Sequence, residues 1–269
     1  MNDNAKVFSL IEMREMMIDT SDYQMMEEVG EFTGILEMKA QDKENLPTSE
    51  TITIFTPEEI KIFKDEAFST FSNGKKKYQQ AAAYILMLNT GLRTGEVLGL
   101  LNSDIDLANR VMHLNRGVKE ISKRDGVTAE KGREVKVGKL KSATSKRDVP
   151  LNDTAIEMIL DLRNEFYFGE DSPLIPDGNG NFTRPVNFRK RYYRILKVAG
   201  IETKGLHSLR HTFATNLVNG IKQPDGSIKS LTSRQVADLL GHTTSEITEM
   251  YYVKRDLTKL EGITDDFQF

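Results

Sequence analysis

The chain has 269 residues, of which 38% are apolar and 29% charged, the composition of an ordinary soluble globular protein. It contains no cysteine, which excludes disulfide bonds and metal sites built on thiolates. The first residues lack the basic stretch and apolar run of a signal peptide, and the longest apolar run, residues 81–88, is too short to cross a bilayer. We therefore expect a soluble, intracellular protein with one complete domain and part of a second.

The distribution of charge is uneven. A net charge of −3, taken alone, argues against a nucleic-acid partner, because domains that bind nucleic acid are usually basic. However, residues 1–50 hold 12 acidic and 4 basic side chains, whereas residues 110–150 hold 12 basic and 5 acidic ones. A concentration of basic side chains suits binding to phosphates, and it is equally typical of a solvated, lysine-rich hairpin.

The first hundred residues predict helices. Residues 1–45 have the spacing of one or two amphipathic helices, and the polar residues 41–50 indicate a linker. A new unit begins at Thr56, which precedes a proline and two acidic residues and so predicts a helix start. Residues 78–89 predict an apolar helix that stops at Gly91.

The pattern then changes to short strands. Turn residues separate the segments 104–107, 111–114, 118–121, 135–137 and 148–151. Residues 122–133 are expected to form the tip of a long hairpin. Helices are expected to resume at 153–166, 185–198, 207–219, 233–240 and 245–253. There is no internal repeat, and this order predicts a mostly α domain with a small antiparallel β-sheet, an α+β fold.

Two motifs before residue 152 carry basic side chains of interest. In TGLRTGE (90–96), Arg93 stands at the start of a helix, where the dipole disfavours a cation unless an anion such as phosphate binds there. The alternative is a surface arginine near a helix start. In KLKSATSKRDVPL (139–151), a basic turn leads into a strand, and a lysine there could enter a groove and donate a proton. The alternative is a solvated turn.

Two further motifs lie near the end of the chain. In HSLRHTFAT (207–215), His207, Arg210 and His211 share one helical face. Two histidines at this spacing could ligate zinc, but the glutamate of the H-E-x-x-H pattern is absent, and a structural role is expected for His211. In LLGH, a helix ends at a glycine just before His242. The adjacent tyrosines that follow are more typical of a core and interface pair than of an active site.

Taken together and in this order, the four motifs resemble those of the tyrosine recombinase (phage integrase) family. The resemblance covers roughly residues 50–255, with Tyr251 nine residues after the histidine of LLGH, and it points to integrases of phages and conjugative elements. It implies the catalytic-domain fold of that family. It also implies a site-specific recombinase that cleaves and rejoins DNA through a 3′-phosphotyrosyl intermediate, without a metal or other cofactor, for integration or excision of a mobile element.

The resemblance assigns roles to the phosphate-binding side chains. Arg93 and Arg210 match the two arginines that clamp the scissile phosphate and neutralise the charge of the transition state. His207 resembles the histidine of the family's HxxR motif, and His242 resembles its second phosphate-contacting histidine or tryptophan. Glu96 matches a supporting acid that orients the arginines or histidines.

The resemblance also names the groups that move protons and form bonds. Tyr251 is the nucleophile, with Tyr252 as the rival one position along. A phenol of pKa about 10 needs nearby cations and a histidine to ease its deprotonation. Lys141 resembles the lysine that protonates the departing 5′ oxygen, and Lys139 and Lys146 are the alternatives.

The implied organisation has three parts: a partial helical core-binding segment with its linker (1–47), the catalytic domain (48–256) and a C-terminal tail (257–269) that packs on a neighbouring protomer. Because the first part is short and acidic, most of the family's N-terminal DNA-binding region is expected to be missing. The expected partners are double-stranded DNA, further copies in a tetramer on paired sites, and an accessory DNA-bending or excision protein. The expected location is the bacterial cytoplasm, on the DNA of the nucleoid.

Two other functions remain open at this point. A type IB topoisomerase shares the phosphotyrosyl chemistry, but the integrase-like motifs and the short chain argue against it. A catalytically idle remnant that only holds DNA or a partner protomer would fit the missing N-terminal region, although every expected catalytic residue is present.

Overall fold

The computed structural model describes residues 53–123, 132–140, 146–222 and 227–241. The chain divides into two compact units, and nearly all described residues belong to the larger one, residues 47–119 and 137–269. The described residues of the smaller unit are 120–123 and 132–136. The helices expected within residues 1–45 and 245–253, and most of the expected hairpin tip, lie outside the described residues.

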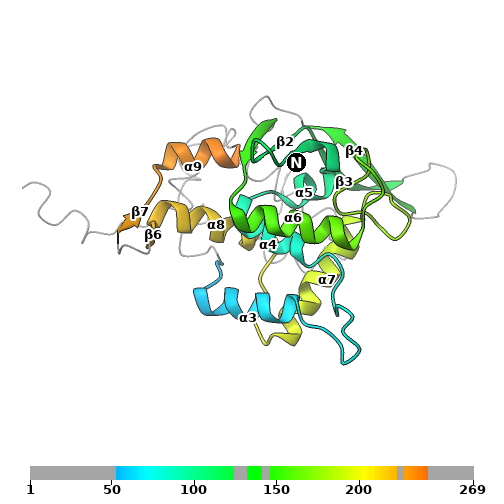
Figure 1. Cartoon of the computed structure of the whole chain (residues 1–269), viewed down its shortest axis with the longest axis horizontal. Helices are drawn as coiled ribbons and strands as arrows, with labels where there is room; N and C mark the ends of the chain where they lie inside the picture. Colours follow the sequence, from blue (N-terminus) through cyan, green and yellow to red (C-terminus); the bar gives the residue numbers. More distant parts are fainter. Residues whose placement is uncertain (1–52, 124–131, 141–145, 223–226, 242–269) are drawn as a thin grey trace, which may run out of the picture. The chain divides into compact units, whose positions relative to one another are not determined.

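Helices are the main regular elements in the described part of the larger unit (Figure 1). In chain order they are α3 (Pro57–Ala67), α4 (Ala82–Thr90), α5 (Thr94–Gly99), the short 3-10 helix η2 (Asn102–Asp104), α6 (Asp153–Glu165), α7 (Pro185–Val198), α8 (His207–Asn219) and α9 (Ser233–Leu240). None of the helices in the described part of the chain is long and apolar enough to span a membrane.

The strands form small sheets. An antiparallel sheet has the order β1-β2-β5 and consists of β1 (Ile105–Asp106), β2 (Val111–Leu114) and β5 (Arg147–Pro150). Two separate pairs are β3 (Arg116–Lys123) with β4 (Gly132–Lys139), and β6 (Ile221–Lys222) with β7 (Ile228–Lys229). A helical domain with small sheets is the predicted fold class, which is therefore confirmed.

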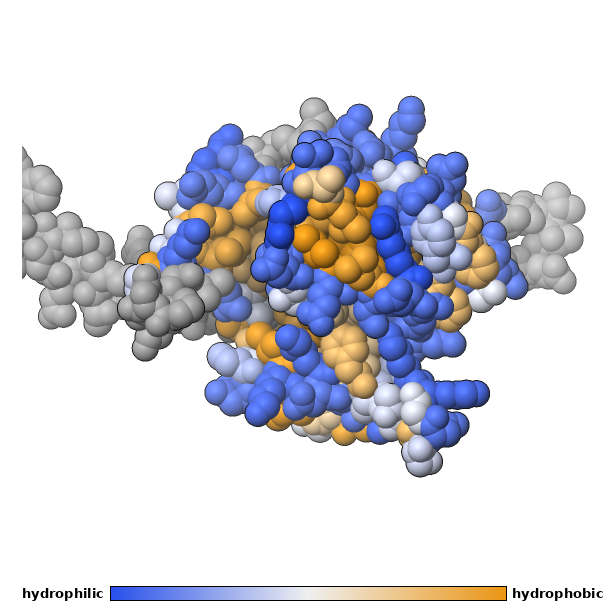
Figure 2. All heavy atoms as spheres, viewed as in Figure 1, coloured by the Kyte–Doolittle hydropathy of each residue, from blue (hydrophilic) through white to orange (hydrophobic). Residues whose placement is uncertain are grey.

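Helix α4 lies at the centre of the larger unit. Its residues are apolar on every side and almost all are buried, as expected for a helix that other elements surround. Figure 1 shows it beside α6 and α8, the helices against which it packs. In the same view, Figure 2 shows that hydrophilic side chains cover most of this face and border the apolar areas.

Aromatic side chains join α3, α4 and α7. We call this group the aromatic core; its members are Phe55, Phe63, Tyr84, Phe188 and Tyr192. The ring centroids of Tyr84 and Phe188 are 4.5 Å apart, and the Tyr84 hydroxyl donates to the Phe188 carbonyl at 2.8 Å. Pairs of this kind contribute about 0.5–1.5 kcal/mol each beyond the burial of their surface.

The predicted start of α3 is confirmed. Thr56 Oγ1 accepts a hydrogen bond from the Glu59 N–H at 3.2 Å, and the Glu59 carboxylate accepts one from the Thr56 N–H at 2.8 Å. These two bonds satisfy backbone donors that the first turn of a helix leaves without partners.

The predicted start of α4 at residue 78 is wrong, because the helix begins at Ala82. Gln80 has a φ of 57°, outside the helical range. Its N–H donates to the Glu165 carboxylate at 2.9 Å, and its side-chain amide donates to the Pro176 carbonyl. These partners are 85 and 96 residues away, so the local apolar pattern does not reveal them.

The hairpin of β6 and β7 is an element that the sequence pattern above does not predict. Its strands are only two residues long, too short for an alternating pattern. The signal that was available is the Pro-Asp-Gly sequence at residues 224–226, which is typical of a turn.

Candidate active site

The turn between α4 and α5 positions the first motif. Gly91 ends α4 with a φ of 64°, as predicted, and its N–H donates to the Met87 carbonyl at 2.9 Å. A Cβ at this position would lie 2.5 Å from Phe213 Cδ1 and 2.7 Å from Leu240 Cδ2. Glycine is therefore required both by the backbone conformation and by close packing. The turn brings Arg93 to the N-cap of α5.

Glu96 is buried on α5, with 3% of its side chain exposed, and it accepts hydrogen bonds from two arginines. Its carboxylate accepts from the Arg93 backbone N–H at 2.9 Å and from Arg93 Nη1 at 3.1 Å. Arg147 donates to the two oxygens at 3.0 and 3.2 Å. Burial by itself would raise the pKa of Glu96, but the charges of Arg147, Arg93 and Arg210, with the Arg147 hydrogen bonds, lower it to about 2. Glu96 is thus a fixed negative charge.

Two glycines seat α5 directly on β3. A Cβ at Gly95 would lie 2.9 Å from the Val118 carbonyl oxygen, and one at Gly99 would lie 2.8 Å from the Arg116 carbonyl oxygen. These glycines are four residues apart and therefore share one face of the helix. Their close approach fixes α5, and with it Glu96.

Arg147 is a member of the site that the sequence pattern did not single out. Its side chain is 8% exposed, and in addition to Glu96 it contacts α9, because its Nε donates to the Leu239 carbonyl at 2.8 Å. A signal was available: side chains alternate along a strand, so Arg147 shares a face of β5 with the buried Val149. An arginine on an inward face needs a partner such as Glu96.

Arg210 connects two of the predicted motifs. It lies on α8 and is 1% exposed. Its Nη1 donates to the Gly91 carbonyl at 2.8 Å, and its Nη2 donates to the Leu240 carbonyl at 2.9 Å. Arg210 thereby joins the α4–α5 turn to the end of α9. Because the last carbonyls of a helix lack partners within the helix and carry partial negative charge, two arginines suit the adjacent carbonyls of Leu239 and Leu240.

His207 and His211 lie on the same face of α8 as Arg210. His207 is the first residue of the helix and is half-buried, and its ring is 4.7 Å from the ring of His211 between centroids, in an edge-on arrangement. Within the described ranges, no three His, Cys, Asp or Glu side chains form a group that could hold a metal ion.

Several predicted site residues lie outside the described residues: Lys141, His242, Tyr251 and Tyr252. Their roles stay predictions. Of the alternatives for the lysine, Lys139 ends β4 and Lys146 directly precedes β5, and both are exposed. The predicted helix end before His242 is confirmed, because Gly241 caps α9 with a φ of 69°.

The structure thus brings together side chains from three of the four motifs, TGLRTGE, KLKSATSKRDVPL and HSLRHTFAT. We call Arg93, Glu96, Arg147 and Arg210 the arginine–glutamate cluster. Two guanidinium groups contact the Glu96 carboxylate, and the charge of a third, Arg210, also acts on it, which leaves an excess of positive charge among the described members. Such an excess suits the binding of an anion and the stabilisation of negative charge that develops during a reaction.

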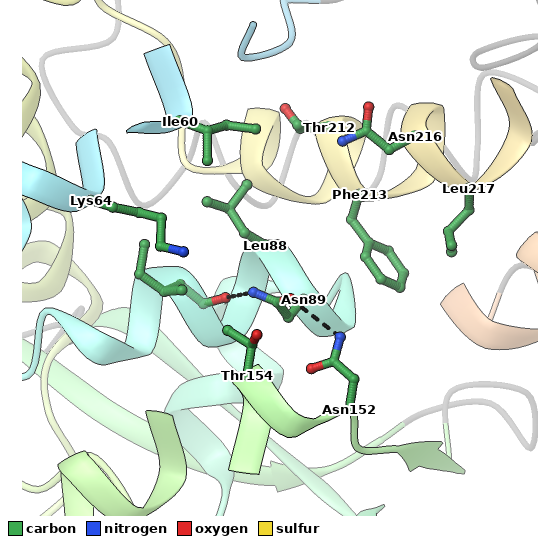
Figure 3. Close-up of a pocket in the computed structure, with 11 residues that line it drawn as sticks. Ile60, Lys64, Leu88, Asn89, Asn152, Thr154, Thr212, Phe213, Asn216 and Leu217 are labelled. Carbon is green, nitrogen blue, oxygen red and sulfur yellow. Dashed lines mark hydrogen bonds between the residues drawn. The ribbon is translucent and has the colours of Figure 1, made fainter. Parts of the chain in front are cut away.

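A groove of about 280 Å³ opens elsewhere in the larger unit, between α3, α4, α8 and the start of α6. Figure 3 shows Leu88 and Phe213 on its apolar side and the amides of Asn89 and Asn152, which are hydrogen-bonded to each other at 3.2 Å. None of the predicted catalytic residues lines it. The groove is therefore separate from the arginine–glutamate cluster.

Comparison with known proteins identifies the family. The model of the phage integrase family matches residues 54–258. The chain belongs to the phage integrase family of tyrosine recombinases. The membership that the four motifs suggested is therefore confirmed.

Relatives and solved structures of this family extend the comparison. The chain is 30% identical over 236 residues to a tyrosine recombinase XerC-like protein of Caldanaerobacter subterraneus, covering 79% of this chain and 57% of the relative. It is 29% identical over 194 residues to tyrosine recombinase XerC of Corynebacterium glutamicum, covering 70% and 50%. The chain spans about half the length of these relatives.

The fold is similar to that of the Tn1549 transposon integrase, solved in complex with a circular intermediate DNA. The TM-score is 0.62 at 17% sequence identity, and the match covers 96% of this chain and 83% of that chain. This similarity shows that the two proteins share a fold.

Proposed function

We propose that this chain is the catalytic part of a site-specific DNA recombinase that cleaves and rejoins DNA through a 3′-phosphotyrosyl intermediate, for integration or excision of a mobile element. The arginine–glutamate cluster is the observation that carries the proposal. It gathers cations from motifs as far apart as Arg93 and Arg210 in a member of the phage integrase family. The names of the relatives, tyrosine recombinases and a transposon integrase bound to DNA, support it.

In the proposed reaction, the Tyr251 hydroxyl oxygen attacks the scissile phosphorus. A bond forms between this oxygen and phosphorus, and the bond between phosphorus and the 5′ oxygen breaks. The phenol loses its proton with the help of neighbouring cations and a histidine, while Lys141 protonates the departing 5′ oxygen. A 5′ hydroxyl from another duplex then reverses these steps. Because the phosphotyrosyl bond conserves the energy of the cleaved bond, no nucleotide cofactor is needed.

The cluster would act on the phosphate. Arg93 and Arg210 neutralise charge on its non-bridging oxygens, and His207 and His242 contact the same group. The guanidinium pair then supplies the electrostatic stabilisation that metal ions supply in other phosphoryl-transfer enzymes. Glu96 orients the guanidinium of Arg93, in agreement with the 3.1 Å contact between them.

The proposed partners follow from this reaction. Recombination requires double-stranded DNA and a tetramer of protomers on paired sites, and an accessory DNA-bending or excision protein would set its direction. We propose that residues 48–256 form the catalytic domain, between a partial core-binding segment (1–47) and a C-terminal tail (257–269). The proposed place of action is the bacterial cytoplasm, on the DNA of the nucleoid.

Trapping of the covalent intermediate tests the proposal. The protein is incubated with a pool of nicked duplexes that have a randomised core, and the protein–DNA adduct is isolated under denaturing conditions and its DNA sequenced. We expect a protease-sensitive adduct with a shared core sequence. Tyr251→Phe should abolish the adduct, and Tyr252→Phe should retain it. An adduct that persists in both variants contradicts the assignment of the nucleophile.

The same experiment separates the other functions. An adduct without a shared core sequence, together with relaxation of supercoiled plasmid, would identify a type IB topoisomerase. Binding of duplex DNA without any adduct, unaffected by Arg93→Ala, would identify a protein that only holds DNA.

A further inference from the structure

Arg147 lies between Glu96 and the end of α9 in the arginine–glutamate cluster. It begins β5, the strand in the last part of the lysine motif, and its guanidinium contacts two other elements. On one side it donates to both oxygens of Glu96, on α5. On the other side it donates to the Leu239 carbonyl, in the last turn of α9. One side chain thus joins three segments of the candidate active site.

The geometry of these contacts requires a guanidinium. Two parallel N–H groups fix the plane of a carboxylate, which the single ammonium of a lysine does not do. Glu96 Oε1 accepts from both Arg147 and Arg93, and Glu96 Oε2 accepts from Arg147 and from the Arg93 backbone. The orientation that Arg147 gives to the carboxylate therefore sets the position of Arg93, both side chain and backbone.

We propose that Arg147 is a positioning residue for DNA strand cleavage, acting through Glu96 on Arg93 and through the Leu239 carbonyl on the end of α9, three residues before His242. This inference rests on the proposed function. Arg147 does not contact the phosphate in this scheme. It orients Arg93, one of the groups that do, through the Glu96 carboxylate.

The charge of Arg147 also keeps Glu96 ionised. Burial opposes the charged form, and among the cations that oppose burial Arg147 contributes most to lowering the Glu96 pKa. The charged groups around Glu96 in the described residues are Arg93 on its own helix, Arg147 on β5 and Arg210 on α8. Removal of Arg147 leaves the buried Glu96 carboxylate with less positive charge nearby, so its pKa rises. When Glu96 is protonated, its ion pair with Arg93 is lost.

The competing interpretation is that Arg147 only stabilises the fold. A matched control exists on β3, where Arg116 is half-buried and pairs with the buried carboxylate of Asp104, outside all four motifs. Arg116 Nη1 also donates to the Gly99 carbonyl at 3.5 Å, so this control, like Arg147→Gln, removes a contact with α5, but not one with Glu96. Arg147→Gln and Arg116→Gln each remove an arginine from a buried carboxylate. A general loss of stability affects both variants, whereas a role in positioning affects cleavage only in the first.

The first test is the single-turnover rate of adduct formation on a duplex selected by trapping, at saturating protein. We expect Arg147→Gln to slow it about 10- to 100-fold, the usual effect of losing a group that orients a reacting residue, with little change in DNA binding. Arg147→Lys keeps the charge but not the paired bonds, and it should recover only part of the rate. Arg116→Gln should cleave at the wild-type rate. Should Arg147→Gln fail to fold, Arg147→Lys alone decides: a wild-type rate overturns the proposal.

A pH profile provides a readout that fold stability does not move. The cleavage rate of Arg147→Gln should decrease toward acid pH, because Glu96 then takes up a proton in this range. Wild type and Arg116→Gln should lack this decrease. Identical profiles for the variant and wild type would contradict the route through Glu96.

Arg147 directly follows Lys146, so it could act by positioning the lysine segment and Lys141 instead of Glu96. A modified substrate distinguishes these two routes. Sulfur in place of the bridging 5′ oxygen makes a leaving group that needs no proton. It should restore cleavage to Lys141→Ala and not to Arg147→Gln. Restoration of Arg147→Gln would overturn the proposed route. If wild type forms no adduct, the proposed function fails; if wild type and Arg147→Gln form it equally fast, only this inference fails.

Discussion

The aromatic core and the arginine–glutamate cluster hold the same domain together in different ways. The aromatic core joins α3, α4 and α7 through ring contacts, without any charged group among its five members. The cluster joins the ends of elements: the turn after α4, the start of β5 and the last carbonyls of α9.

This difference has a consequence for function. Ring contacts are less directional than hydrogen bonds, because their attraction is spread over many atom pairs. Hydrogen bonds from a guanidinium are directional, and a buried charge that loses its partner is strongly unfavourable. We therefore expect the aromatic core to determine how stable the domain is, and the cluster to determine where its cations lie.

The largest expected effect on chemistry is that of Arg210→Ala. It removes a phosphate-binding group in the proposed mechanism, and loss of one such donor typically costs about 10²- to 10³-fold in rate. The single-turnover cleavage rate, normalised to folded protein, measures this. The control is Arg163→Ala. Arg163 is a half-buried arginine on α6 that likewise donates to a backbone carbonyl, that of Asn102. Equal rates for the two variants would contradict a role of Arg210 in binding the phosphate.

The opposite result is expected for Phe63→Ala. Phe63 is fully buried in the aromatic core, and truncation of such a ring typically lowers the free energy of unfolding by about 3–5 kcal/mol. Denaturant unfolding checks this value. The cleavage rate per folded molecule should remain that of wild type. A large fall in that rate would show that the aromatic core also positions the active site.

Gly91→Ala should have an intermediate effect on stability and should also disturb the cluster, because Arg210 donates to the Gly91 carbonyl. Gly91 and Gly200 have similar φ values, 64° and 67°, so a side chain is strained at either position. At Gly91 a Cβ would also collide with Phe213 and Leu240, whereas at Gly200 no atom lies within 4 Å. Overpacking adds about 1–3 kcal/mol. We therefore expect Gly91→Ala to unfold more readily than Gly200→Ala by that amount, and to slow cleavage as well.

The smallest expected effect is a change in the dependence of stability on pH. The pKa of Glu96 is lowered from 4.5 to about 2 in the folded state. Because the pKa is lower in the folded state, ionised Glu96 stabilises the fold at pH values above about 4.5, and this contribution is lost as the pH falls from about 4.5 toward 2. Thermal unfolding from pH 7 to pH 2 should show this loss in wild type and a smaller loss in Glu96→Gln. The same slope in both proteins would show that Glu96 is not held as the cluster requires.

Local signals in the sequence predicted what local chemistry determines. The cap at Thr56 and the glycine ends at Gly91 and Gly241 were predicted correctly, because each depends on a few adjacent residues. The start of α4 was not, since contacts with Glu165 and Pro176 set the conformation of Gln80.

The candidate site shows the same limit. Arg93, Glu96 and Arg210 stand in motifs that the family resemblance picks out, and the structure brings them together. Arg147 was missed because its importance comes from Glu96, 51 residues away, and from α9, 92 residues away. Which side chain of a basic segment turns inward depends on how the strand packs, and the basic segment alone does not reveal it.

Cleavage of a substrate with a neutral scissile group tests the central claim most directly. A methylphosphonate at the scissile position replaces a charged non-bridging oxygen with a methyl group and removes the charge that Arg93 and Arg210 would neutralise. We predict that Arg93→Ala, which is slow on the ordinary phosphate, regains much of its cleavage on the methylphosphonate. Arg93→Ala that is equally slow on both substrates would contradict an arginine clamp on the DNA phosphate.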